Sequence, residues 1–302
     1  MRIFLTGTTG YLGGSLAVTL LSNGHHVRGL TRSEPAFAAL RGLGVDPVLG
    51  DLDDQRVLAD EARAADAVVN AADSDHAGAV QALLTALDGS GKPLLHTSGS
   101  SIVGEASNGE VQDDVYTEAD VAPGSAWRPA PEKAARVAID REVMAAADRG
   151  VRSVVLCNTM IYGTGLGLSA DSVQIPRLVA TARRTGTPRH IGAGANIWSN
   201  VHLADACDLY VRALEGAAPG SFYFVENGEA TFRDITTSIA SALRLPPPRP
   251  IGIEDAIAEW GYEPAVYALG SNSRVRGVRS RDDLDWRPRH TSVTDWIARS
   301  LT

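Results

Sequence analysis

The chain has 302 residues, a formal net charge of −8 and a hydrophobic content of 44%. This composition is typical of a globular protein with a sizeable core and excludes a fibrous or largely disordered chain. The acidic balance argues against a nucleic acid or an anionic membrane as partner, so we expect a small-molecule substrate.

The sequence offers no sign of export or of a metal site. The apolar run after Arg2 is three residues long, too short for a signal peptide, and no later stretch is long enough to span a bilayer. Cys157 and Cys207 are too few and too far apart for a disulfide framework or a thiolate metal site. No histidine or carboxylate pair has convincing metal-ligand spacing. We therefore expect a cytoplasmic protein without a metal.

Short β-rich runs alternate with segments of helical periodicity in the first half of the chain. The runs are RIFLTG (2–7), HHVRGLT (25–31), VDPVLGD (45–51), DAVVNAA (66–72), KPLLHTS (92–98) and VRSVVLCN (151–158). Alternation of this kind predicts an α/β fold with a doubly wound parallel sheet of the Rossmann type. From about Gly163 the helices lengthen and strands become fewer. We therefore divide the chain into a dinucleotide-binding domain, 1–162, and a smaller substrate-binding lobe, 163–302, partly interleaved with the first.

The stretch TGTTGYLGG follows the first predicted strand and opens the first predicted helix. In this context the glycines have physical roles: Gly7 permits a tight turn, Gly10 lets a pyrophosphate approach, and Gly13 lets helix and strand pack closely. The predicted phosphate-binding segment consists of Gly7, Thr8, Thr9, Gly10, Tyr11, Leu12 and Gly13. A glycine-rich turn without a ligand is the weaker alternative.

The end of the second strand decides which dinucleotide is bound. A carboxylate there holds the ribose hydroxyls of NAD, whereas an arginine holds the additional phosphate of NADP. Arg32 follows the strand directly in GLTRSEP, so NADP(H) is favoured, while the nearby Glu34 leaves NAD(H) as an alternative. An ordinary surface arginine is a further alternative. Asp51 and Leu52 are predicted to face the adenine, and the short side chains of Ala71 and Ala72 to leave room for the cofactor.

These motifs resemble the extended short-chain dehydrogenase/reductase superfamily, which includes NAD-dependent epimerases and dehydratases. The resemblance also rests on HTSGSSIVG (96–104), TMIYGTG (159–165), the NVHLAD segment that contains His202 and Asp205, and the tail 279–297. It implies hydride transfer between a nicotinamide and a substrate carbon. It further implies a tyrosine that exchanges a proton with the substrate, a lysine four residues later, and a serine or threonine after the fifth strand.

The expected Tyr-x-x-x-Lys pair is missing from the sequence. The only lysines are Lys92 and Lys133, and neither has a tyrosine four residues earlier. Segment 130–149 nevertheless resembles the catalytic helix, and counting back from Glu142 places Ala134 and Ala138 at the two positions. Lys133 then adjoins the tyrosine position and is a candidate for holding a ribose or a phosphate; a solvent-exposed lysine is the alternative.

Another side chain is then needed to exchange a proton with the substrate. Ser98 is the predicted substrate-orienting serine, with Ser100 as its rival because neighbours in a strand alternate faces; Ser98 is equally well explained as a loop cap. Tyr162 is the leading tyrosine candidate because it follows the sixth strand, although its counterpart in the family more often shapes the pocket. We expect His202 and Asp205 to organise the lobe.

Three functions fit the sequence. The first is an NADP(H)-dependent carbonyl reductase or alcohol dehydrogenase with an atypical proton donor. The second is a redox-neutral sugar-nucleotide epimerase or dehydratase, which would use some of Arg177, Arg183, Arg184, Arg274 and Arg276 around a diphosphate. The third is a non-catalytic NADP(H) sensor. The alanine-rich stretch AARVAIDREVMAAA further predicts a homodimer that packs through this helix.

Overall fold

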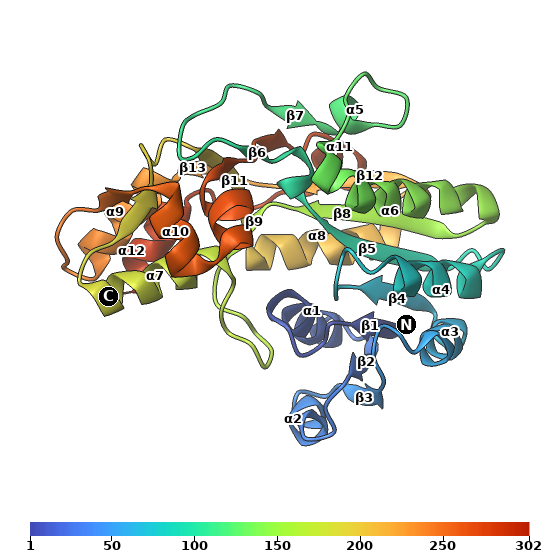
Figure 1. Ribbon diagram of the computed structural model, residues 1–302. Coiled ribbons are helices and arrows are strands. Elements are labelled where there is room, and N and C mark those ends of the chain that lie inside the picture. Colours follow the sequence, from blue (N-terminus) through green and yellow to red (C-terminus); the bar gives the residue numbers. More distant parts are fainter. Residues whose placement is uncertain (302) are drawn as a thin grey trace.

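A computed structural model describes residues 1–301, and its main feature is a seven-stranded parallel sheet of order β12-β8-β5-β4-β1-β2-β3 (Figure 1). The chain builds β1 to β3 in one direction and then β4, β5, β8 and β12 in the other. The order therefore reverses between β1 and β4, which is where such sheets bind ligands. The strands are β1 (Arg2–Thr6), β2 (His26–Thr31), β3 (Asp46–Leu49), β4 (Ala67–Asn70), β5 (Pro93–Gly99), β8 (Arg152–Asn158) and β12 (Ser221–Val225).

The predicted doubly wound α/β fold is confirmed. Each of the six β-rich runs overlaps one strand of the sheet. The seventh strand, β12, lies in the half of the chain for which we predicted a lobe of mainly helices.

Helices cover both faces of the sheet (Figure 1). On one face α1 (Tyr11–Ser22), α2 (Ala36–Gly42) and α8 (Leu203–Gly216) enclose a core that contains Leu16, Leu40 and Leu209. On the other face α3 (Gln55–Ala64), α4 (Ala77–Leu87) and α6 (Ala134–Ala145) enclose a second core. Burial of these apolar stripes against the sheet is the main force that holds the domain together.

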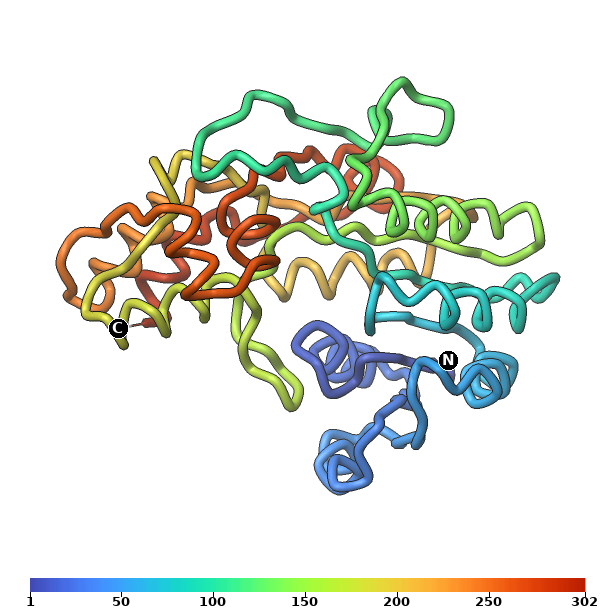
Figure 2. The backbone as a smooth tube through the Cα atoms, viewed as in Figure 1, coloured from blue at the N-terminus to red at the C-terminus, as the bar shows by residue number. Residues whose placement is uncertain are grey.

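A smaller lobe with its own core lies beside the sheet, at the end where the chain finishes (Figure 2). It consists of α7 (Gln174–Thr185), α9 (Phe232–Ala242), α10 (Ile253–Trp260), α12 (Val293–Ser300) and a three-stranded sheet of β13 (Glu229–Thr231), β11 (Ile197–His202) and β9 (Met160–Tyr162). A parallel pair joins β10 (Arg189–Ile191) and β14 (Arg249–Ile251).

The remaining elements are short and mostly connect the two parts. They are η1 (Ser100–Val103), β6 (Glu105–Ala106), β7 (Tyr116–Thr117), α5 (Glu118–Val121), η2 (Pro131–Lys133), η3 (Ala146–Arg149), η4 (Pro264–Leu269), β15 (Ser271–Asn272), β16 (Val275–Arg276) and α11 (Arg279–Asp283).

Residues after 162 contribute to both parts of the molecule, because β12 and α8 complete the large sheet and its helical layer. The division of the chain at residue 162 stays a prediction. Within residues 1–301, no helix combines the length and the apolar character needed to cross a membrane.

Candidate functional site

The glycine-rich turn between β1 and α1 has the backbone shape that the sequence predicted. Gly7 has φ +72, and a Cβ there would come within 2.4 Å of the Ala71 carbonyl oxygen. A Cβ on Gly13 would lie 2.2 Å from the Gly7 carbonyl oxygen, so the helix can approach the turn only without a side chain. No side chain caps the N-terminus of α1 within the described structure, and its first turn holds no carboxylate. This end of the helix is therefore suited to an anion.

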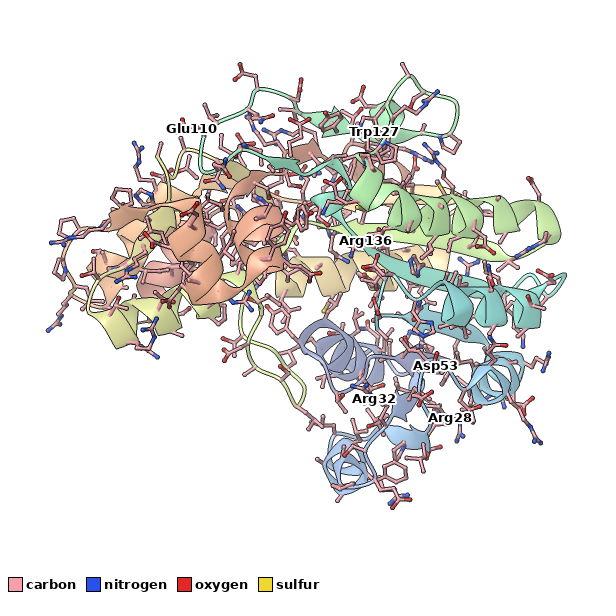
Figure 3. The ribbon with its side chains drawn as sticks, viewed as in Figure 1. Arg28, Arg32, Asp53, Glu110, Trp127 and Arg136 are labelled. Atoms are coloured by element: carbon pink, nitrogen blue, oxygen red, sulfur yellow. The ribbon has the colours of Figure 1, made fainter. Side chains whose placement is uncertain are left out.

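A cavity of about 430 Å³ lies beside this turn, on the side of β2 and β3. Arg32 and Asp53 reach it from loops at the same edge of the sheet (Figure 3). Arg32 is exposed and has no hydrogen bond or ion pair within residues 1–301, so its guanidinium is available to a ligand. Asp51 accepts hydrogen bonds from the backbone N–H groups of Asp53 (2.9 Å) and Asp54 (3.0 Å), which fixes the loop after β3.

The predicted cofactor residues divide into three groups. Those that line this smaller cavity are Gly7, Thr9, Arg32, Asp51, Leu52 and Ala72. Tyr11 lines a second, larger cavity, where its hydroxyl donates to the Gly163 carbonyl oxygen (2.9 Å). The others, Thr8, Gly10, Leu12, Gly13 and Ala71, line neither cavity.

Three further residues line the smaller cavity and were not predicted from the sequence: Asp53, Asp73 and His76. His76 caps α4 by accepting from the Ala79 N–H at Nδ1 (3.0 Å), so its Nε2 carries the proton and donates to Asp53 (3.2 Å). The sequence could have indicated these residues only by their positions, because all three follow strands at the carboxyl edge of the sheet.

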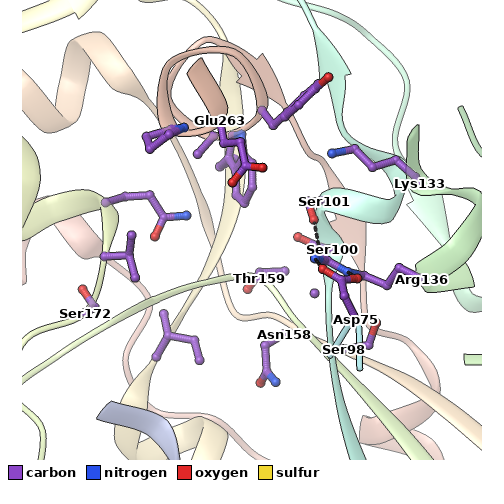
Figure 4. A pocket seen from close by; sticks show the side chains of 18 of the residues that line it. Asp75, Ser98, Ser100, Ser101, Lys133, Arg136, Asn158, Thr159, Ser172 and Glu263 are labelled. Atoms are coloured by element: carbon purple, nitrogen blue, oxygen red, sulfur yellow. Dashed lines mark hydrogen bonds and ion pairs between the residues drawn. The ribbon is translucent and has the colours of Figure 1, made fainter. Parts of the chain in front are cut away.

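The larger cavity, of about 620 Å³, lies between the sheet and the lobe (Figure 4). Its walls carry many polar side chains and come from the ends of β5 and β8, from η2 and the start of α6, from 172–174 and from η4. Ser98, Lys133 and Arg136 line it, together with the carboxylates of Asp75, Glu132 and Glu263. This cavity also contains Tyr11, so it continues from the glycine-rich turn.

The helix register inferred from Glu142 does not place its two positions at the cavity. Ala134 and Ala138 are exposed and do not line the cavity, whereas Glu132 and Arg136 do. Asp140, only 2% exposed, is the acid that faces the sheet, and counting back from it leads to Glu132 and Arg136.

Arg136 is held in place at the cavity wall. Its Nε donates to Asp75 (2.7 Å), its Nη2 pairs with the same carboxylate, and its Nη1 donates to the Ser101 hydroxyl (2.8 Å; Figure 4). This pairing lowers the pKa of Asp75. Because Nε and both terminal nitrogens each already have a partner, Arg136 is held in one position and contributes a fixed positive charge to the cavity wall.

The structure separates the two serines considered for the substrate. Ser98 lines the cavity, is 3% exposed and donates from Oγ to a carboxylate oxygen of Asp140 (2.8 Å). Ser100 also lines the cavity, but its hydroxyl is hydrogen bonded to Ser273 (2.9 Å) in the segment that follows β15.

Lys133 is a half-buried cation without an ion-pair partner in the described chain. Its Nζ lies 4.1 Å from the ring centroid of Tyr267, so a cation–π contact joins η2 to η4 across the cavity. Burial, followed by repulsion from Arg136, lowers the pKa of this amine. Tyr267 is a cavity residue that the sequence analysis did not single out.

Tyr162 does not reach either cavity. It is fully buried in the core of the lobe, its hydroxyl donates to the His290 carbonyl oxygen (3.3 Å), and its ring packs edge-on against His202. Asp205 accepts from the backbone N–H of Arg289 (3.0 Å) and of His290 (2.8 Å). These contacts match the organising role expected of His202 and Asp205.

None of the five arginines considered for a diphosphate lines the larger cavity. Arg274 (3.0 Å) and Arg276 (2.9 Å) both pair with Glu229, and Arg184 pairs with Glu259. Arg177 lines a separate surface depression. Lys133 and Arg136 are thus the cationic side chains of the cavity within the described residues.

The sequence is similar to known proteins. The family model for the NAD dependent epimerase/dehydratase family matches residues 3–223. The oxidase ucsJ of Acremonium sp is 32% identical over 95% of this chain and 92% of its own length. The 2-alkyl-3-oxoalkanoate reductase of Stenotrophomonas maltophilia is 29% identical over 82% of this chain and 77% of its own length.

The fold also matches solved structures. The dTDP-glucose 4,6-dehydratase DesIV of Streptomyces venezuelae, crystallised with NAD and TYD, superposes with a TM-score of 0.77, covers 100% of this chain and 96% of its own, and is 23% identical in sequence. At this identity the likeness extends to the fold.

Proposed function

Because the chain belongs to the NAD dependent epimerase/dehydratase family, we propose that it is an NADP(H)-dependent oxidoreductase that interconverts a carbonyl and an alcohol on a small organic substrate. The observation that carries this proposal is the larger cavity. It begins at the glycine-rich turn, at the carboxyl edge of the sheet, and the described residues that line it include two cationic side chains, Lys133 and Arg136, and no cluster of free arginines.

The described residues fit a dinucleotide. The turn at Gly7 and Gly13 has room for backbone only, and the uncapped N-terminus of α1 favours a pyrophosphate. The adenosine half would then occupy the smaller cavity, beside Asp51, Leu52 and Ala72, and the nicotinamide half the larger one, beside Tyr11. When bound, the nicotinamide supplies or takes up the hydride.

The preference for NADP(H) over NAD(H) rests on Arg32. Its unpaired guanidinium at the smaller cavity suits a ribose phosphate, which accepts bidentate hydrogen bonds from arginine. The carboxylates of Asp51, Asp53 and Asp73 line the same cavity and favour the ribose hydroxyls of NAD(H) instead. The two kinds of group therefore favour different cofactors. We propose NADP(H) because Arg32 has no ion-pair partner within residues 1–301 that would compete with a phosphate.

The proposed catalytic machinery includes Ser98 and Lys133 but leaves out Tyr162. Ser98 places a hydroxyl at the cavity wall, and Lys133 offers an unpaired ammonium to a polar or anionic group of the substrate or to a cofactor ribose. Tyr162 is excluded from this proposal because its hydroxyl is engaged inside the lobe.

The first experiment is a titration of the purified protein with NADPH and NADH, followed by NADPH consumption over a panel of aldehydes, ketones and 3-oxoacids. We expect NADPH to bind more tightly and to be consumed with at least one substrate class. Tight binding without turnover would favour a sensor. Conversion of a nucleotide sugar without net NADPH consumption would favour the redox-neutral alternative.

A further inference from the structure

A series of buried polar side chains leads from the cavity at Ser98 into the interior. The Ser98 hydroxyl donates to Oδ2 of Asp140 (2.8 Å), and Asp140 belongs to α6, which packs against β5 and β8. Among residues 1–301, Oδ1 of the same carboxyl has no hydrogen-bond partner. It lies 3.8 Å from Nε2 of His96, which is fully buried and has no partner among those residues either. Two polar atoms thus face each other in the interior without a full hydrogen bond.

The hydrogen bonds on the other side of His96 fix its tautomer. Thr6 Oγ1 accepts from the N–H groups of Ala71 (3.1 Å) and Ala72 (3.2 Å), so its own proton goes to Asn70 Oδ1 (2.6 Å). The Asn70 amide nitrogen then donates to His96 Nδ1 (3.1 Å). Since Nδ1 accepts, the ring proton is on Nε2 and points toward Asp140.

The surroundings of Asp140 favour its protonated form. Burial raises the pKa of this carboxyl to about 7, against smaller opposing effects of the Ser98 hydrogen bond and Arg136. Burial also lowers the pKa of His96 to about 4, so the imidazole is neutral near pH 7 and does not compensate a carboxylate with a full charge.

The other groups that face Asp140 do not supply a free counter-charge. Arg136, on the same helix, is committed to Asp75. Cys157 of β8 lies on the sheet side, and burial raises the pKa of its thiol, which keeps it neutral.

We propose that Asp140 stores the proton for carbonyl reduction and that Ser98 relays it to the substrate oxygen, in place of the tyrosine of the family. This inference rests on the proposed function. The 2.8 Å separation between Ser98 and Asp140 serves either direction of donation. When Asp140 is protonated, it donates to Ser98 Oγ, and the Ser98 hydroxyl is free to donate into the cavity.

When bound, the nicotinamide would supply the hydride for the new C–H bond, and the electron pair of the carbonyl π bond would move to the substrate oxygen. That oxygen takes the Ser98 proton while Ser98 takes the proton of Asp140, which leaves a buried carboxylate. His96 is a positioning residue here, since its Nε2–H faces the developing anion. After the alcohol leaves, Ser98 passes a proton from water in the cavity back to the Asp140 carboxylate. In sum, one carbonyl, one NADPH and one proton give one alcohol and one NADP⁺.

The decisive variant is Asp140→Asn, which keeps the shape and a hydrogen bond to Ser98 but holds no dissociable proton. In the wild type we expect kcat for reduction to fall about tenfold per pH unit above about pH 7, and kcat for alcohol oxidation with NADP⁺ to fall as pH drops below it. Asp140→Asn should lower kcat by at least about 100-fold, within the usual range for general acid catalysis, and leave the Kd of NADPH unchanged. Ser98→Ala should do the same.

The matched control is Glu118→Gln. Glu118 is also a buried carboxyl whose pKa is raised by burial, but it binds the backbone N–H groups of Phe224 (3.2 Å) and Val278 (3.1 Å) and does not line the cavity. This variant should keep the pH profile of the wild type. If Asp140→Asn keeps its turnover and the fall of kcat above about pH 7, the relay is overturned, whereas the proposed reductase function still stands.

An infrared titration of the NADPH complex separates the relay from the proposed function. We expect a carboxylic acid band that persists near pH 6.5 in the wild type and in Glu118→Gln and is lost in Asp140→Asn. If the wild type reduces no substrate of the panel, the proposed function fails; the band then still decides whether Asp140 stores a proton. Absence of any such difference between the wild type and Asp140→Asn would overturn the relay.

Discussion

Arg32 is an arginine without a partner among the described residues, beside three carboxylates that line the same cavity. We expect Arg32→Ala to weaken NADPH binding by about 1.5 to 3 kcal/mol, the range for a hydrogen bond to a charged group, and to leave NADH binding nearly unchanged. Isothermal titration with both cofactors measures this. The control is Arg41→Ala, an exposed arginine of α2 that packs over Phe37 (5.5 Å) outside the cavity. Equal losses for NADPH and NADH would contradict the assignment.

The buried carboxyl of Asp140 also has a consequence for stability. Its pKa is raised by burial from 3.8 to about 7 in the folded protein, so the folded state binds the proton more tightly than the unfolded state. Its contribution to the free energy of unfolding is complete below about pH 4 and is lost as pH rises through about 7. We therefore expect the Tm of Asp140→Asn, relative to the wild type, to rise between about pH 5 and pH 8. Differential scanning fluorimetry at fixed salt checks the trend, and a constant difference would show that Asp140 is already ionised.

At the residue scale, the sequence predicted which side chains line the cavity better than it predicted the residues that contact them. Ser98 and Lys133 do line the larger cavity. The partners of those residues, Asp140 and Tyr267, come from segments about 40 and more than 130 positions away, and no local pattern encodes such contacts. On α6, likewise, only packing against the sheet distinguishes the buried Asp140 from Glu142.

At the scale of elements, the contact between β1 and α1 depends on the absence of one side chain. Gly13→Ala would place a methyl group 2.2 Å from the Gly7 carbonyl oxygen, so helix and turn must separate. We expect a loss of roughly 2 to 4 kcal/mol in the free energy of unfolding, together with loss of dinucleotide binding. Urea denaturation and NADPH titration measure the two effects.

The matched control for this prediction is Gly42→Ala. Gly42 also lies in a helix, α2, but its added methyl would meet nothing within 4 Å. Because alanine is the better helix former, this variant should be neutral or more stable by up to about 1 kcal/mol. Similar destabilisation by both substitutions would mean that close packing at Gly13 is not the cause.

The elements of the first half of the chain were predictable because each strand is a short, nearly continuous apolar run bounded by turns. In contrast, β12 has the sequence SFYFV in a region of long helices, and its place beside β8 is decided by a pairing over about 70 residues. Local periodicity carries no information about that partner.

At the scale of the whole molecule, α6 presents several alanines to solvent on one side. Ala134, Ala138 and Ala145 are exposed there, and Arg141 lies between the last two. We propose that two copies of the chain pack through this face, and we expect a dimeric mass by light scattering at micromolar concentration. Ala138→Arg should shift the mass toward the monomer, whereas Ala39→Arg, on an exposed position of α2, should not. A monomeric wild type would remove this proposal.

The placement of β12 has a consequence for how the protein is made. Until residue 225 has left the ribosome, β8 is an edge strand with its backbone groups and the sheet face near Phe224 uncovered. Exposed edges of this kind pair with other chains. A nascent chain that stops after the sixth strand is therefore prone to aggregation, and expression of residues 1–162 alone should give insoluble protein where the full chain is recovered in the supernatant.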